Sequence, residues 1–130
     1  MKKYSFKLPL YGQNVTLVQV EGKDDADAIM PVLKDNKLSM EDAQQTIEGI
    51  RRGCFNGGDT YRNFQIERVL VIFYLMKSER TRANIYSHEK RHIEDRVLEW
   101  AGISDIEASA FLAGFLGEKF YEFTELVRKK

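Results

Sequence analysis

Several residue types are scarce in this 130-residue chain, and each scarcity excludes a class of protein. A single cysteine, Cys54, rules out an internal disulfide and is typical of a reducing compartment. Twenty basic residues cancel twenty acidic ones, so no overall field attracts nucleic acid or anionic lipid. No apolar run approaches the roughly 20 residues of a membrane span, and the first residues lack the pattern of a signal peptide. We therefore expect a cytoplasmic protein with no nucleic-acid or membrane partner.

The rest of the composition is that of an ordinary folded domain. Apolar residues make up 43% of the chain and charged residues 31%, which is typical of globular proteins. A chain of 130 residues is long enough for one domain with a sizeable hydrophobic core but too short for two domains. We therefore predict a single domain over residues 1–130.

The order of apolar and turn-forming residues predicts an α+β fold. Two β-prone runs flank Gly12 and indicate a hairpin, and the apolar run at 69–76 indicates a buried strand because it is rich in β-branched and aromatic residues. The Asn-Gly-Gly-Asp sequence at 56–59 predicts a loop, and Pro31 should shorten or kink the helix around it. We expect a small mixed sheet, formed by the hairpin and one central strand and packed against helices. In chain order, the expected elements are strands at 4–10 and 14–20, helices at 24–33 and 39–53, a strand at 69–76, and helices at 82–101 and 104–127.

Both histidines of the chain lie in one five-residue segment, His88-Glu89-Lys90-Arg91-His92, which has the pattern H-E-x-x-H. Residues four apart lie on the same face of a helix, so the two imidazoles can bind one Zn²⁺. Glu89 follows about 100° around the helix, where it can hold a metal-bound water and accept its proton. We predict a metal site with His88 and His92 as ligands and Glu89 as the catalytic base.

The residues that follow this motif extend the pattern. An Ala-Gly-Ile turn occupies 101–103, and the segment Asp-Ile-Glu-Ala-Ser-Ala-Phe-Leu occupies 105–112. With the motif, they resemble minimal zincin-like metallopeptidases of the gluzincin type, small proteins that phages and other mobile elements often encode. The resemblance covers roughly residues 69–120. It implies a zincin-like core, a peptide or protein substrate, Glu89 as general base, and zinc bound by His88, His92 and Glu107.

The role of Glu107 depends on how its helix meets the helix that carries the motif. In a tight antiparallel hairpin around residue 103, Glu107 would lie level with Glu99, about 10 Å along the axis from His92. Zinc binding then requires an early end to the first helix or a steep crossing angle. Alternatively, Ser104 and Glu107 fit a capping box, which would keep the glutamate at the start of its own helix. Asp105 is the rival candidate for third ligand.

The histidines also have a simpler interpretation, as solvent-facing residues of a charged helix. Lys90 and Arg91 are both charged, whereas many zincins carry an apolar residue at one of these positions. Two functions therefore remain open. The first is a zinc-dependent metallopeptidase, a hydrolase in which a zinc-activated water attacks the peptide bond. The second is a catalytically inactive zincin-like scaffold that acts as a protein-interaction module, for example as an accessory factor of a phage or mobile element.

Overall fold

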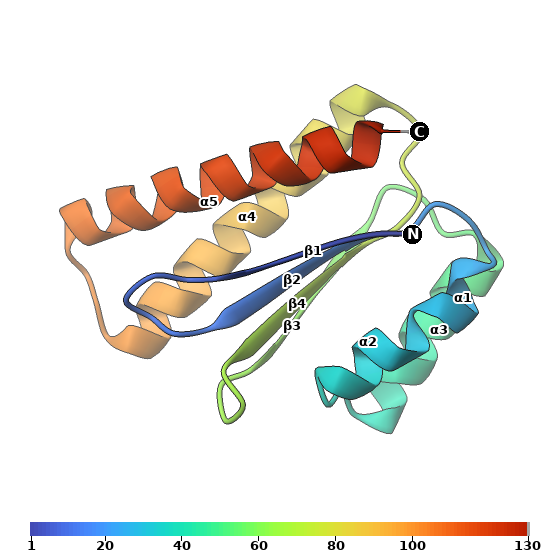
Figure 1. The fold of residues 1–130 in the computed structure, drawn as a ribbon, viewed down its shortest axis with the longest axis horizontal. Helices are drawn as coiled ribbons and strands as arrows, with labels where there is room; N and C mark the ends of the chain where they lie inside the picture. The colour runs from blue at the N-terminus through green and yellow to red at the C-terminus, as the bar shows by residue number, and fades with distance from the viewer. Residues whose placement is uncertain (130) are drawn as a thin grey trace.

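The fold is a four-stranded sheet with helices on both faces (Figure 1). The computed structural model describes residues 1–129. Two long antiparallel helices, α4 and α5, cover one face, and three shorter helices, α1 to α3, cover the other (Figure 1). The elements are β1 (Lys2–Lys7), β2 (Asn14–Gln19), α1 (Asp25–Ala28), α2 (Met30–Asp35), α3 (Met40–Arg52), β3 (Gly58–Asn63), β4 (Arg68–Phe73), α4 (Glu79–Ala101) and α5 (Ile106–Arg128).

The strands form a mixed sheet in the order β1-β2-β4-β3. β1 and β2 pair antiparallel as the predicted hairpin, and β2 pairs in parallel with β4. β3 pairs antiparallel with β4 and forms one edge of the sheet. The predicted α+β class and mixed sheet are therefore confirmed, with β4 as the buried central strand.

The central strands are buried on both faces, which explains their continuous apolar sequences. From β4, Val69, Val71 and Phe73 pack against α4 and α5 in one hydrophobic cluster. Leu70 and Ile72 point the other way and pack with residues of α1 to α3 in a second cluster. The sheet thus has a hydrophobic core on each of its two faces.

The predicted loop at 56–59 is wrong at its C-terminal end, because β3 begins at Gly58. Glycines normally weaken strands, so Gly57 and Gly58 were interpreted as a turn. Pairing with β4 overrides this local preference: Gly58 lies opposite Phe73, and Gly57 accepts a hydrogen bond from the Tyr74 amide at 3.0 Å. The missed strand is the one that lies beside the predicted metal site.

The helix ends largely follow the sequence. Ser39 caps α3 by accepting a hydrogen bond from the Asp42 amide at 3.1 Å, and Gly53 ends the helix in the left-handed conformation, with φ of 70°. Pro31 divides the expected helix at 24–33, because it lies in the first turn of a separate helix, α2. None of the helices over residues 1–129 is both long and apolar enough to cross a membrane.

Candidate metal centre

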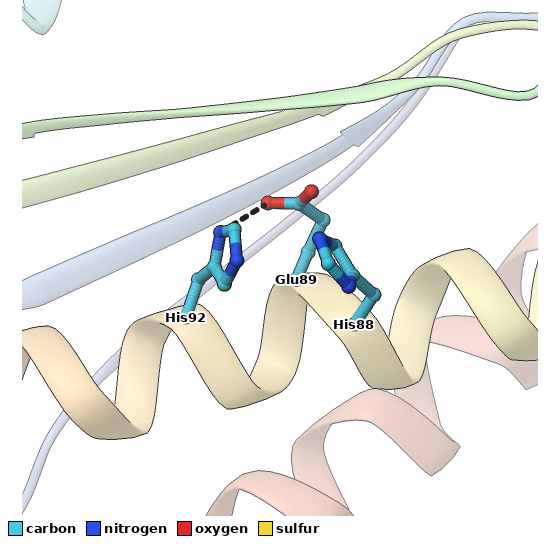
Figure 2. A group of neighbouring side chains, drawn as sticks. All are labelled: His88, Glu89 and His92. Atoms are coloured by element: carbon cyan, nitrogen blue, oxygen red, sulfur yellow. Dashed lines mark ion pairs between the residues drawn. The ribbon is translucent and has the colours of Figure 1, made fainter.

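The candidate site lies on α4, on the side of the helix that faces β3. Ser78 begins the helix by accepting a hydrogen bond from the Thr81 amide at 3.1 Å, and Gly102 ends it at φ of 68°. The buried positions of α4 recur every three or four residues, as expected for a helix with one face against a sheet; they include Tyr86, Glu89, Ile93 and Val97. All three side chains project from the side of α4 that faces the sheet (Figure 2), and this spacing buries Glu89 but leaves His92 half-buried and His88 exposed.

His88, Glu89 and His92 form a group that could hold a metal ion, as the motif predicts. Each offers a ligand atom, and these atoms lie within 4.8 Å of one another. The two imidazole rings lie side by side, with their centroids 4.4 Å apart. Glu89 is only 5% exposed, whereas His88 is exposed and the side chain of His92 is 44% exposed. One buried carboxylate and two accessible imidazoles thus converge, a donor set of the kind that Zn²⁺ and other divalent transition metals accept.

The Glu89 carboxylate has a defined environment between α4 and β3. The Thr60 hydroxyl donates a hydrogen bond of 2.6 Å to its Oε2, and His92 Nδ1 lies 3.6 Å from the same oxygen. Gly58 lets the strand approach closely, because a Cβ at this position would lie 3.1 Å from Glu89 Cγ. A buried carboxylate is costly unless it is hydrogen-bonded or paired, so the hydrogen bond from Thr60 stabilises Glu89 in this position.

A groove of about 400 Å³ lies between β3 and α4, and Glu89 and His92 of this group line it. Along an antiparallel pair of strands, every second residue hydrogen-bonds to the partner strand, and the residues between point their N–H and C=O groups the other way. Gly57 is hydrogen-bonded to Tyr74, so the N–H and C=O groups of Gly58, Thr60 and Arg62 point away from β4, toward the free edge of the sheet. The groove is therefore bordered by unpaired strand backbone on one side and by α4 on the other. Its lining residues are Gly58, Asp59, Thr60, Tyr61, Arg62, Glu89, His92 and Arg96.

The metal-binding group does not include Glu107. Glu107 is exposed in the first turn of α5, and α4 continues unbroken to Ala101. A Cβ on Gly117 would lie 3.8 Å from Lys90 Cε, so these residues are level in the antiparallel pair. By the same register Glu107 is level with residue 100, about 12 Å along the axis from His92. Its role as third ligand stays a prediction that requires α4 and α5 to meet differently.

The start of α5 differs from the predicted capping box. Asp105, not Ser104, is the N-cap: its Oδ1 accepts hydrogen bonds from the amides of Glu107 and Ala108 at 2.7 and 3.0 Å. Asp105 was the rival candidate for third ligand, and its carboxylate is occupied at this helix end. The alternative role of Glu107 in a box with Ser104 is wrong, because Asp105 already satisfies the first amides.

The sequence did not identify the β3 side of the site. Thr60, Gly58 and Arg62 come close to the motif only through tertiary structure, since they precede Glu89 by more than 25 residues in the chain. Arg96 did have a recognisable position, one helical turn after His92 and therefore on the same face. A strand assignment over 58–63 would have placed Thr60 and Arg62 on one face of the sheet.

No family model, curated protein or solved structure matches this chain. The geometry of His88, Glu89 and His92 and of the groove beside β3 is therefore the basis for any inference about function.

Proposed function

We propose that the protein is a zinc-dependent metallopeptidase with a zincin-like core. His88 and His92 bind the metal through one ring nitrogen each, and Glu89 is the general base. The observation that carries the proposal is the buried Glu89 carboxylate beside two accessible imidazoles, with Glu89 and His92 lining a groove along a free strand edge.

The surroundings of Glu89 suit a base that must accept and return a proton. Its Oε2 is held by the Thr60 hydroxyl, so the carboxylate has a fixed direction rather than the freedom of a surface glutamate. Burial limits competition from bulk water, whereas the exposed His88 and the half-buried His92 leave the site open to solvent and substrate. Zinc, when bound, supplies a water of lowered pKa and polarises the scissile carbonyl. Glu89 then takes the proton of the attacking water and passes it to the leaving amine.

The free edge of β3 supports a peptide as the substrate. An extended peptide can pair with the outward backbone groups of Gly58, Thr60 and Arg62, as in other cases of strand addition. A peptide bound there would lie along the groove and bring one of its carbonyl groups over the His88-Glu89-His92 group. Main-chain pairing of this type holds peptides of many sequences in one orientation.

The first experiment is the zinc content per chain of protein purified without a histidine tag, before and after incubation with zinc. We expect about one zinc per chain, lost in His88→Ala and His92→Ala. Glu99→Ala is the matched control, since this exposed glutamate lies on the same stripe of α4 about 10 Å beyond His92. Glu107→Ala tests the third ligand: loss of zinc would require a rearranged α4–α5 pair. Absence of zinc from the wild-type protein under all conditions would overturn the proposal.

The second experiment separates the two roles open to Glu89. As a base, Glu89→Gln keeps zinc but abolishes hydrolysis of fluorescently labelled casein. As a ligand, the same substitution releases zinc, and the site is then a closed structural one. This second outcome contradicts the peptidase mechanism.

One observation favours the alternative function, a zincin-like scaffold that binds a partner protein without turnover. Large apolar side chains are exposed where the β1–β2 loop approaches the turn between α4 and α5, and a pocket formed by both segments lies there. Exposed apolar surface of this kind often marks an interaction site. The exposed apolar residues on this surface are Leu10, Trp100, Ile106 and Phe111. A protein that binds zinc but hydrolyses no peptide would support the scaffold.

A further inference from the structure

We propose that Arg62 and Arg96 form a carboxylate-binding subsite in this groove, so that the preferred peptides carry a carboxylate two or three residues from the bond over Glu89. This inference rests on the proposed function for the position of the cleaved bond. The binding of an acidic peptide by the two arginines requires only the groove.

The two arginines approach the groove from opposite walls. Arg62 belongs to the α4-facing set of β3 residues, two positions after Thr60, and Arg96 lies one helical turn after His92. Both line the same groove as Glu89. From Glu89 to Arg96 the helix rises about 10 Å, which an extended peptide spans with about three residues. In a bound peptide, a residue whose carboxylate lies between the two guanidinium groups is therefore two or three residues along the peptide from the residue whose carbonyl lies over Glu89.

Neither guanidinium is neutralised by the protein. Over residues 1–129, no carboxylate lies within 4.0 Å of Arg62 or Arg96, whereas the neighbouring Arg91 is paired with Asp95 at 3.3 Å. Asp59 lines the groove, but its carboxylate accepts a hydrogen bond of 2.9 Å from Tyr74, which packs in the cluster on the other face of the sheet. The basic end of the groove thus lacks an acidic partner.

Arg62 is also held in place without losing its charge. Its guanidinium lies 5.6 Å from the centre of the Phe64 ring, and that ring stacks on Trp100 at 5.1 Å. A cation over an aromatic face keeps its N–H donors available, and guanidinium groups bind carboxylates with two parallel hydrogen bonds. The carboxylate can come from an Asp or Glu side chain or from the C-terminus of a peptide.

The test compares wild-type protein with Arg62→Ala/Arg96→Ala in two assays of one random decapeptide library. Zinc-loaded wild-type protein is incubated with the library and the products are sequenced by mass spectrometry. Separately, immobilised Glu89→Gln protein captures uncleaved peptides, with and without the two arginine substitutions. Half of the library has an amidated C-terminus and half a free one, which distinguishes the two sources of carboxylate. Arg80→Ala is the control, an exposed arginine outside the groove.

We expect about tenfold enrichment of peptides with a carboxylate at one fixed position, lost in the double variant and kept in Arg80→Ala. Enrichment in amidated peptides identifies an acidic side chain, and enrichment only in free-acid peptides identifies the C-terminus. Cleavage without any carboxylate preference would overturn the subsite but leave the peptidase intact. Capture of acidic peptides without cleavage would support the subsite and contradict the peptidase. Neither cleavage nor preferential capture would overturn both.

Discussion

At the scale of single residues, the most constrained group in the groove is the Glu89 carboxylate. It is buried, and a single hydroxyl, that of Thr60, donates a hydrogen bond to it. We predict that Thr60→Val lowers the free energy of unfolding by about 1–3 kcal/mol, because the buried carboxylate loses its donor. Urea denaturation at neutral pH measures this change. Thr60→Ser keeps the hydroxyl and should recover most of the loss; a Val variant as stable as wild type would contradict this account.

Gly58 is the second residue on which this carboxylate depends. An alanine there would place its Cβ 3.1 Å from Glu89 Cγ and 3.3 Å from Phe73 Cδ1, which is tighter than ordinary packing. We predict that Gly58→Ala destabilises the fold by about 1 kcal/mol or more, because the buried neighbours must move. Gly22→Ala is the matched control, since no atom lies within 4 Å of its added Cβ. Equal thermal stability of the two variants would show that the strand and α4 are not tightly packed.

The same residues show what the sequence could predict of the site. His88, Glu89 and His92 were predictable because their relation is local: a helix alone brings them to one side. Thr60 and Arg62 were not, because their approach to α4 depends on the pairing of β3 with β4. The β3 wall of the groove could therefore not be predicted from the sequence, because it forms only when β3 pairs with β4.

At the scale of elements, both ends of α3 and the C-terminal end of α4 were easier to predict than the edge strand, whereas α4 begins at Glu79 rather than at residue 82. Ser39, Gly53 and Gly102 act within one turn of their own helices, so their roles follow from residue type. β3 has two glycines at or before its start and is half exposed along its length, which removes the apolar alternation typical of strands. Its conformation is imposed by β4, whose position was predicted from its apolar run, although that strand ends at Phe73 rather than at residue 76.

The cap of α5 provides a prediction at this scale. Asp105 Oδ1 accepts hydrogen bonds from two amides of the first turn, whereas Ser104 precedes the cap. We predict that Asp105→Ala lowers the free energy of unfolding by about 1 kcal/mol, the usual cost of a lost N-cap. Ser104→Ala should change it by less than about 0.5 kcal/mol. Urea denaturation of both variants measures the difference, and a larger loss for Ser104→Ala would restore the capping-box interpretation.

At the scale of the whole molecule, the sheet is held between two cores by buried polar contacts as well as by apolar packing. Tyr86 of α4 donates a hydrogen bond of 2.5 Å to Gln19 Oε1, and Gln19 Nε2 donates to the Tyr74 carbonyl at 2.9 Å. Tyr74 in turn donates its hydroxyl to Asp59 on the opposite face. These contacts link α4, β2, β3 and the residue that follows β4, so both faces of the sheet depend on protonated tyrosines.

This arrangement predicts an alkaline limit to stability. Burial raises the pKa of Tyr86 well above its ordinary value of about 10, and burial together with the nearby Asp59 carboxylate raises the pKa of Tyr74 in the same direction. Below pH 10 both phenols are protonated in the folded and unfolded chains. As the pH rises above 10, only the unfolded chain ionises them, so the free energy of unfolding falls.

We predict that the free energy of unfolding of the wild-type protein declines steeply between about pH 10 and 11.5. Tyr86→Phe should be less stable at pH 7, because Gln19 Oε1 loses its donor, but should decline less steeply above pH 10, because one linked ionisation is removed. Urea denaturation across this range gives both slopes, and tyrosinate absorbance reports when the phenols ionise. If the free energy of unfolding fell with pH at the same rate in both proteins, Tyr86 would ionise as readily in the folded chain as in the unfolded one. The hydroxyl of Tyr86 could not then be a buried donor to Gln19 Oε1 that stabilises the contact of α4 with the sheet.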